Sequence, residues 1–280
     1  MHLQCGQHRI ELGRPVVMGV LNVTPDSFSD GGHFLDPSAA LDRAAQLIEE
    51  GASIVDVGGE STRPGAAPVS AGEELRRVMP VVERLAATIS VPVSIDTRKP
   101  EVMREALAAG ATLVNDVSAL AAPGALEAVA ASKAAVCLMH MQGEPGSMQD
   151  APCYGDVVAE VRDFLTARAA ACEAAGIARE RLAVDPGFGF GKTLEHNLAL
   201  LAGLPAIVAD GLPVLAGLSR KRMIGSLTGR AEGDRLAGSL AAAVVAAIKG
   251  ARIIRAHDVR ATVDALAVLA GSGALRDNRA

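Results

Sequence analysis

Five polar side chains follow closely after short apolar runs of this sequence. They are two carboxylates, two carboxamides and one amine: Asp96, Asp185, Asn22, Asn115 and Lys221. An apolar run without polar alternation is typical of a strand buried on both faces of a parallel sheet. Because parallel strands of a barrel end on one face, we expect these side chains to meet in one pocket. Buried charges need partners, so the group forms either a ligand site or a self-contained ion-pair network around Lys221.

Positive charge gathers at three places in a sequence that is acidic overall, with a formal net charge of −5. These places are Arg63, residues 219–222, and the pair Arg255 and His257. Residues 219–222 come where a helix is expected to begin, and a helix N-terminus adds hydrogen-bond donors for an anion. The alternative is a solvated run of charge, which three adjacent basic residues usually form. We therefore expect an anionic group of a ligand at this rim.

The segment 185–193, DPGFGFGKT, is similar in composition to a phosphate-binding loop. Three residues separate its first and last glycines, one fewer than that loop requires, so we do not expect it to bind phosphate. We interpret Phe188 and Phe190 as walls for a flat ring beside Asp185, with a core position as the alternative for Phe188. His140, nearby in the expected fold, is interpreted as structural.

Composition bounds the class of protein. Of the 280 residues, 50% are hydrophobic, 21% are charged and only 2% are aromatic, so we expect a large aliphatic core. The negative net charge argues against a nucleic-acid groove and against an anionic membrane surface. The four cysteines form no Cys-x-x-Cys pair, so we expect reduced thiols, with Cys137 in the core. Residues 1–13 lack the apolar segment of a signal peptide and the run 236–248 is too short to span a bilayer, so we expect a cytoplasmic protein.

Segments with the patterns of strands and helices alternate along the chain. We expect strands at 16–21, 53–57, 91–95, 112–114, 135–139, 182–184, 213–217 and 252–254. We expect helices at 37–50, 71–89, 100–109, 125–131, 156–175, 194–201, 234–249 and 258–270. This alternation predicts an α/β fold, a single (β/α)8 TIM barrel over residues 1–280, with a hairpin or arm at 1–14 and a frayed tail at 271–280. A doubly wound open sheet is the alternative, but no Gly-x-Gly-x-x-Gly follows the first strand.

The loops after the first two predicted strands, 24–36 and 60–70, are rich in Gly, Pro, Ser and Thr. This composition suits mobile lids that close over a substrate, and ordinary surface loops have a similar composition. The first loop contains the aromatic Phe28, and the second contains Thr62, Arg63 and Pro64 beside a strand end. These residues favour the lid interpretation.

The motifs at the strand ends are those of a known family. They are MGVLNVTPDSFSDGG (18–32), DVGGESTRPGA (56–66), SIDT (94–97), NDVS (115–118), DPGFGFGK (185–192), GLSRKR (217–222) and RAHDV (255–259). In this order they span essentially the whole chain, and the sequence resembles dihydropteroate synthase. The resemblance implies a homodimeric barrel that condenses 6-hydroxymethyl-7,8-dihydropterin pyrophosphate with p-aminobenzoate to give 7,8-dihydropteroate. It also implies a requirement for Mg²⁺ and inhibition by sulfonamides.

The resemblance implies roles for single residues in binding the pterin. The ring would contact Asp96, Asn115, Asp185, Lys221 and Arg255. Within this set Asp185 would accept two parallel hydrogen bonds from the 2-amino and N3 edge, and Asp96 would lie near N8. Mg²⁺ would be bound by the carboxamide oxygen of Asn22.

The resemblance places the other two ligand groups at the rim. Pyrophosphate would contact Thr62, Arg63, Arg255 and His257, and p-aminobenzoate would contact Phe28, Thr62, Pro64, Phe190 and Ser219. The catalytic residues would be Asp96, Lys221, Arg255 and His257, acting in a dissociative substitution in which pyrophosphate leaves before the arylamine attacks. The sequence departs from some family members at Arg222, where they have Ser. Only the backbone N–H of residue 222 is then available to the p-aminobenzoate carboxylate.

Two other functions are alternatives. A pterin-binding methyltransferase module would have the same pocket but would pass a methyl group to a corrinoid partner, without use for the pyrophosphate residues. A catalytically inactive pterin-binding homologue would have lost Asn22, Arg63 or Lys221, and all three are present. The Ala- and Leu-rich helices 234–249 and 258–270 are the predicted dimer face, and packing against the barrel alone is the alternative.

Overall fold

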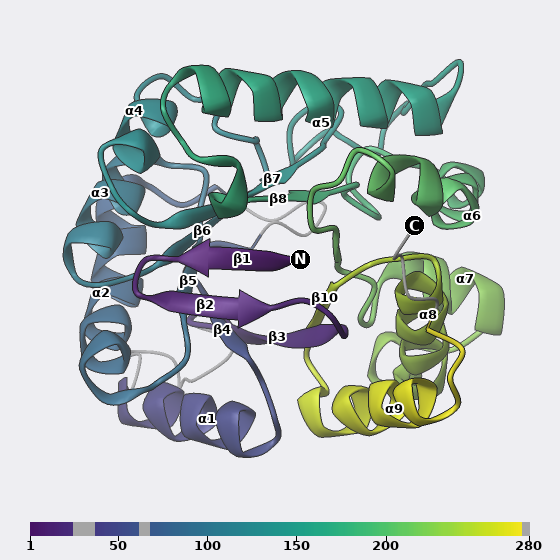
Figure 1. The fold of residues 1–280 in the computed structure, drawn as a ribbon, viewed down its shortest axis with the longest axis horizontal. Helices are drawn as coiled ribbons and strands as arrows, with labels where there is room; N and C mark the ends of the chain where they lie inside the picture. Colours follow the sequence, from purple (N-terminus) through teal and green to yellow (C-terminus); the bar gives the residue numbers. More distant parts are fainter. Residues whose placement is uncertain (25–36, 62–67, 276–280) are drawn as a thin grey trace.

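Eight parallel strands form a ring at the centre of the computed structural model, which describes residues 1–24, 37–61 and 68–275 (Figure 1). The strands are β3 (Val16–Asn22), β4 (Ile54–Gly58), β5 (Val93–Asp96), β6 (Leu113–Asp116), β7 (Ala135–Met139), β8 (Leu182–Asp185), β9 (Leu215–Ala216) and β10 (Ile253–Ala256). They are hydrogen-bonded in the order β8-β7-β6-β5-β4-β3-β10-β9. A parallel bridge between Val184 and Val214 joins the two ends of this order. The predicted TIM barrel is confirmed, and the doubly wound open sheet is excluded.

Nine α-helices in the described part of the chain surround the ring (Figure 1). They are α1 (Pro37–Glu49), α2 (Ala71–Thr88), α3 (Pro100–Ala108), α4 (Ala125–Ala130), α5 (Val157–Ala174), α6 (Leu194–Val208), α7 (Arg222–Thr228), α8 (Leu236–Ile248) and α9 (Val259–Gly271). Local sequence starts them: the Asp156 side chain caps α5, and Thr193 and His196 form a capping box on α6. Within the described residues, none of the helices has the length and apolar character needed to cross a membrane.

The predicted N-terminal hairpin consists of β1 (His2–Cys5) and β2 (His8–Glu11), which pair antiparallel. Figure 1 shows it crossing the ring of strands. Its apolar side chains join those inside the barrel in one buried cluster: Leu3, Cys5, Ile10, Leu12, Met18, Ile54, Leu113, Ala135, Cys137, Ala183, Leu215 and Ile253. The hairpin therefore closes the end of the barrel at which the strands begin, and Cys137 is a core residue as predicted.

Strand register brings polar residues together at the opposite end. Asn22 pairs with Gly58, Gly58 with Asp96, and Asp96 with Asn115. Two residues earlier in β4, Asp56 pairs with Ser94 of β5. Because side chains two residues apart on a strand share a face, the polar residues form layers directly above the apolar cluster.

The predicted end of one helix is wrong. The helix predicted at 194–201 continues to Val208, because Gly203 and Pro205 lie inside α6 instead of ending it. A Cβ at Gly203 would lie 2.7 Å from Cγ2 of Val158, so the glycine permits close packing of α5 against α6. Packing between the helices therefore overrides the local stop signals.

The strand predicted at 213–217 is also shorter than expected. The strand β9 has two residues, and Pro213 before it has no N–H to donate to a sheet ladder. Its carbonyl still accepts a hydrogen bond from the Val184 N–H at 2.9 Å. The tail is predicted at residues 271–280. The helix α9 ends at Gly271, and residues 276–280 are outside the described part of the chain.

Candidate active site

Gly217, one residue beyond β9, lies where three charged side chains approach one another. A Cβ at this position would lie 3.8 Å from Nζ of Lys221, 3.9 Å from Oδ2 of Asp185 and 3.9 Å from Cβ of Arg255. Asp185 ends β8, Arg255 belongs to β10, and Lys221 directly precedes α7. The fold therefore brings together three charged residues from distant parts of the sequence, as the strand-end pattern predicts.

Arg255 links two carboxylates across this end of the barrel. Its Nε donates to Oδ2 of Asp56 at 2.6 Å, and its Nη2 donates to Oδ2 of Asp96 at 2.7 Å. Asp56 is completely buried, and it also accepts hydrogen bonds from the Ser94 hydroxyl at 2.6 Å and the Asn115 amide at 3.1 Å. The five side chains form one connected network, which fixes the orientation of the guanidinium.

Burial controls the charges of this pocket. Burial raises the pKa of Asp96 to about 7, although the positive charge of Arg255 acts to lower it. Burial also raises the pKa of Asp185, although the positive charge of Lys221 acts to lower it. Burial also lowers the pKa of Lys221 to about 8, although Asp185 opposes this. For Arg255 burial acts downward, but the carboxylates of Asp56 and Asp96 outweigh it and raise the pKa. Three carboxylates face two cations, so a ligand that offers N–H donors or positive charge is favoured.

The glycine-rich turn after β8 contacts Lys221. Its Nζ donates to the carbonyl oxygen of Phe188 and lies 4.7 Å from the centre of the Phe190 ring. Phe188 is completely buried in the main core, whereas Phe190 is half-buried. The core alternative is therefore correct for Phe188, and Phe190 alone of the two is placed to border the pocket.

Lys192 is buried behind the same turn. Its Nζ lies 2.9 Å from Nδ1 of His140 and donates to the carbonyl oxygens of Gly187 and Phe190, each at 3.0 Å. Burial lowers the pKa of Lys192 to about 7 and that of His140 to about 3, so the imidazole is neutral and accepts the hydrogen bond. Gly187 has a φ of +70°, and a Cβ there would overlap the carbonyl oxygen of His140. Lys192 thus binds backbone carbonyls, which is not the role of a phosphate-loop lysine.

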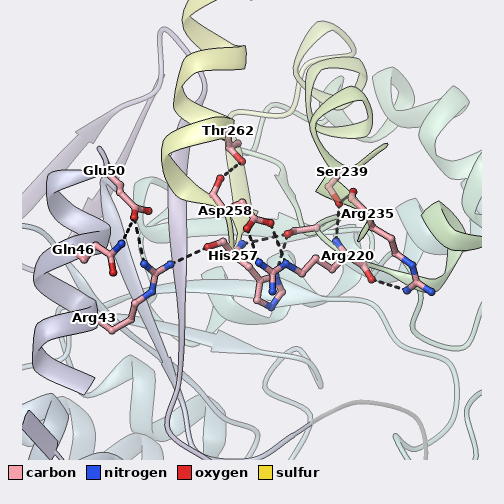
Figure 2. Close-up of polar contacts among 10 residues, drawn as sticks. Arg43, Gln46, Glu50, Arg220, Arg235, Ser239, His257, Asp258 and Thr262 are labelled. Atoms are coloured by element: carbon pink, nitrogen blue, oxygen red, sulfur yellow. Dashed lines mark hydrogen bonds and ion pairs between the residues drawn. The ribbon is translucent and has the colours of Figure 1, made fainter. Parts of the chain in front are cut away.

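Ser219 and His257 lie together at the rim of the pocket. Oγ of Ser219 lies 3.0 Å from Nδ1 of His257 and accepts from the backbone N–H of His257 at 3.3 Å. Arg43 of α1 donates to the carbonyl oxygen of His257 at 3.1 Å, as Figure 2 shows. Residues predicted for p-aminobenzoate and for pyrophosphate are thus in direct contact.

The remaining predicted residues are those of the two loops and the predicted metal ligand Asn22. Phe28, Thr62, Arg63 and Pro64 lie outside the described residues, as do most of the loops 24–36 and 60–70. Asn22 is half-buried at the end of β3. Among residues 1–24, 37–61 and 68–275, no group of three or more His, Cys, Asp or Glu side chains is placed to hold a metal ion.

Asp56 and Lys192 belong to the site but are not among the residues predicted from the sequence. The available signal for Asp56 is a carboxylate inside the apolar strand β4, where an unpartnered charge would be costly. The signal for Lys192 is a single lysine that closes a glycine- and phenylalanine-rich segment. Both residues stabilise groups that border the pocket.

Comparison with known proteins identifies the family. Residues 18–257 match the family model described as pterin binding enzyme. The chain is 54% identical over 270 residues to the dihydropteroate synthase of Escherichia coli strain K12, covering 96% of each chain. The chain belongs to the dihydropteroate synthase family.

Solved structures of dihydropteroate synthases have the same fold. The Xanthomonas albilineans enzyme with 4-aminobenzoic acid has a TM-score of 0.92 and 56% identity, over 98% of this chain and 99% of that one. The same enzyme in complex with 7,8-dihydropteroate gives a TM-score of 0.89 at 53% identity, over 99% and 100%. The Yersinia pestis dihydropteroate synthase with a sulfonamide drug complex gives 0.92 at 50% identity, over 98% and 99%. Similarity to dihydropteroate synthases over nearly full length disfavours the methyltransferase alternative.

Proposed function

We propose that this pocket condenses 6-hydroxymethyl-7,8-dihydropterin pyrophosphate with p-aminobenzoate by a dissociative substitution. As a member of the dihydropteroate synthase family, the chain is a transferase that joins a pterin to p-aminobenzoate to form dihydropteroate. The observation that carries the assignment to this pocket is the convergence of Asp185, Lys221 and Arg255 around Gly217.

The pterin ring is proposed to bind between Asp185, Asn115 and Lys221. A carboxylate accepts two parallel hydrogen bonds from the 2-amino and N3 edge, and burial of Asp185 makes these charge-assisted bonds strong. Asn115 supplies both a donor and an acceptor, and Lys221 donates to the O4 and N5 side. Arg255 covers one face of the ring, where Asp56 and Asp96 hold its guanidinium. The excess of carboxylates over cations supports binding of this donor-rich edge.

The reaction is proposed to proceed through a cation on the pterin methylene. The C–O bond to pyrophosphate breaks first, and the electron pair leaves with pyrophosphate. The charge of Asp96 stabilises the positive ring system, and the p-aminobenzoate amine then attacks the methylene and loses a proton. The arylamine is a free base at neutral pH, so no dedicated general base is required. Catalysis then consists mainly of electrostatic stabilisation and positioning.

Pyrophosphate is proposed to bind at the rim that includes His257 and Arg255, with Thr62 and Arg63. Asn22 fits a Mg²⁺ ligand, because a carboxamide oxygen at the end of a central strand is a hard donor and Mg²⁺ commonly combines few protein ligands with substrate oxygens. Bound there, Mg²⁺ would neutralise charge on the leaving pyrophosphate. The contact between His257 and Ser219 supports adjacent pyrophosphate and p-aminobenzoate subsites.

The p-aminobenzoate subsite is proposed to comprise Phe190 and Ser219, together with Phe28, Thr62 and Pro64. Its carboxylate would lie near the start of α7, where Arg222 is the first helical residue and is exposed. Sulfonamides, which resemble p-aminobenzoate, would bind the same subsite. Relatives solved with 4-aminobenzoic acid and with a sulfonamide support this assignment.

We further propose a single-domain cytoplasmic homodimer over residues 1–280. The predicted dimer helices carry exposed aliphatic side chains: Leu236, Val245 and Ile248 in α8, and Val268 in α9. Exposed aliphatic side chains on neighbouring helices favour association. Sedimentation velocity tests this, since a monomer at micromolar concentration would contradict the dimer.

The decisive experiment measures pyrophosphate release by purified protein from the dihydropterin pyrophosphate and Mg²⁺, with and without p-aminobenzoate. We expect release that depends on p-aminobenzoate and yields dihydropteroate. Tight pterin binding without release would instead support the inactive homologue. Absence of any pterin binding would overturn the assignment of the pocket.

A further inference from the structure

Arg220 has a left-handed backbone conformation between two residues of the candidate site. Its φ is +59°, a region that is disfavoured for residues with a Cβ. At this turn Ser219 contacts His257, while Lys221 contacts the Phe188 carbonyl and the Phe190 ring. The groups around Arg220 must therefore stabilise the conformation that directs its two neighbours.

Contacts from residues at the starts of α8 and α9 hold Arg220 at three points. Its backbone N–H donates to Oγ of Ser239 at 3.0 Å, and its carbonyl accepts from Nη1 of Arg235 at 3.0 Å. Its guanidinium donates to both carboxylate oxygens of Asp258, at 3.0 Å from Nε and 2.5 Å from Nη2. Figure 2 shows Ser239 and Asp258 approaching Arg220 from separate helical segments. Of these contacts, only the ion pair with Asp258 fixes the side chain.

Asp258 does not have the role that its position in a helix suggests. It is the N-cap of α9, yet its side chain makes no hydrogen bond to that helix. An aspartate at an N-cap ordinarily accepts from backbone N–H groups of the first turn and so stabilises the helix. Here the side-chain hydrogen bond at the start of α9 comes from the Thr262 hydroxyl, which donates to the backbone carbonyl of Asp258 at 2.8 Å. Helix capping therefore does not account for the carboxylate.

We propose that Asp258 is a positioning residue for the synthase reaction and acts through Arg220. It follows His257 directly in the chain, while Arg220 lies between Ser219 and Lys221. One bidentate ion pair therefore fixes the residues before and after Arg220 relative to the end of β10. Asp258 contacts no substrate in this role.

This inference rests on the proposed function, which assigns Ser219, Lys221 and His257 to p-aminobenzoate, pterin and pyrophosphate. Small displacements of binding groups cost large factors in rate or affinity, even when the displaced residue is far from the bond that reacts. Loss of the ion pair should therefore impair substrate binding and turnover more than it lowers the stability of the fold.

A second ion pair in the chain provides a matched control. Arg162 donates to both carboxylate oxygens of Asp210, with Nη2 to Oδ1 at 2.7 Å and Nε to Oδ2 at 3.0 Å. Its side chains are 47% and 25% exposed, against 42% and 26% for Arg220 and Asp258. This ion pair joins α5 to the turn that follows α6, and neither of its residues belongs to the candidate site. Partly exposed ion pairs contribute little to stability, so we expect the two pairs to contribute similar small amounts.

The test compares Asp258→Asn, Arg220→Gly, the double variant and Asp210→Asn with the wild type. Glycine adopts a positive φ without strain, so Arg220→Gly removes the side chain and still permits the turn. We measure melting temperature, kcat, KM for both substrates, and amide hydrogen exchange of a peptide covering residues 218–222. For Asp258→Asn we expect a rise in the p-aminobenzoate KM of roughly tenfold. Exchange at 218–222 should be faster, and the melting temperature should change no more than in Asp210→Asn.

The double variant separates action through Arg220 from other effects. We expect it to match Arg220→Gly alone, because Asp258 then has no guanidinium to hold. Additive losses, or Asp258→Asn with wild-type KM and wild-type exchange, would overturn the inference. A loss of activity that only follows the melting temperature would also overturn it. Wild-type protein that forms no dihydropteroate would contradict the proposed function instead, and hydrogen exchange would still decide whether Asp258 holds the turn.

Discussion

Arg255 and Asp56 form a hydrogen-bonded ion pair across the open end of the barrel, with 2.6 Å between Nε and Oδ2. Asp56 is completely buried, and Ser94 and Asn115 also donate to it. The position of the guanidinium over the pocket therefore depends on a carboxylate one layer deeper in the barrel. Asp56 is a structural support for residues to which we assign contact with the pterin.

Replacement of this carboxylate should strongly destabilise the fold. For Asp56→Ala we expect the free energy of unfolding to fall by about 3–5 kcal/mol, because three donors lose their buried acceptor. Urea unfolding measures the change. Ser94→Ala is the control, since it removes one donor and leaves the ion pair, and we expect a loss of about 1 kcal/mol. Equal losses in the two variants would show that the ion pair adds nothing.

Because of Lys192, the free energy of unfolding should increase as the pH rises from neutral to alkaline values. Its pKa is about 7 in the folded protein and 10.5 as the reference for an exposed lysine. Between these values the unfolded chain binds a proton that the folded chain has released, so the contribution of Lys192 to the free energy of unfolding increases as pH rises. Below about pH 7 the full cost of burying the charge is present.

Lys192→Met removes this dependence. The difference in free energy of unfolding between wild type and variant should therefore shift in favour of the wild type from about pH 7 to about pH 9, as measured by urea unfolding. Lys249→Met is the control, because Lys249 also donates to a carbonyl, that of Ala202 at 3.1 Å, but this hydrogen bond is exposed to solvent. A wild-type advantage that is constant with pH would contradict the assignment.

The strand plan could be predicted from sequence because nearly every predicted strand is a largely apolar run that a polar residue closely follows. The rule that parallel strands end on one face was sufficient to bring Asp96, Asn115 and Asp185 to the same end of the barrel. It could not assign Asp56, whose inward direction depends on the register that pairs it with Ser94. A shift by one residue would turn the side chain outward, and a single sequence does not state that register.

Long-range packing accounts for the other differences. Gly203 and Pro205 have the local properties of a helix end, but both lie inside α6, where a Cβ at Gly203 would lie 2.7 Å from Cγ2 of Val158 in α5. Lys192 turns inward because His140, 52 residues earlier, offers an acceptor. Neither partner is adjacent in the sequence, so patterns within a short window cannot reveal these contacts.

Asp96→Asn should slow turnover more than it weakens pterin binding. An asparagine keeps an oxygen that can accept from Arg255, which Asp96 now does at 2.7 Å. It lacks the negative charge that we propose stabilises the cation, and this charge matters most in the transition state. Single-turnover rates and the dissociation constant of the pterin substrate measure the two effects. Equal losses in rate and affinity would exclude the proposed role.

The pH dependence of catalysis should report Asp96 and Lys221. Asp96 must be charged to stabilise a cation, and its pKa of about 7 places the loss of activity on the acid side. Lys221 must be protonated to donate, and its pKa of about 8 places the loss on the alkaline side. We therefore expect a narrow bell for kcat/KM of the pterin substrate at saturating p-aminobenzoate.

Two variants assign the limbs of this profile. Asp96→Asn should remove the acid limb, because an amide does not titrate in this range. Lys221→Arg should carry the alkaline limb to higher pH, because a guanidinium stays protonated, although its planar shape lowers the maximum rate. A limb that persists in both variants belongs to the pyrophosphate of the substrate. An acid limb unchanged in Asp96→Asn would therefore exclude Asp96 as the titrating group, while an alkaline limb unchanged in Lys221→Arg would exclude Lys221.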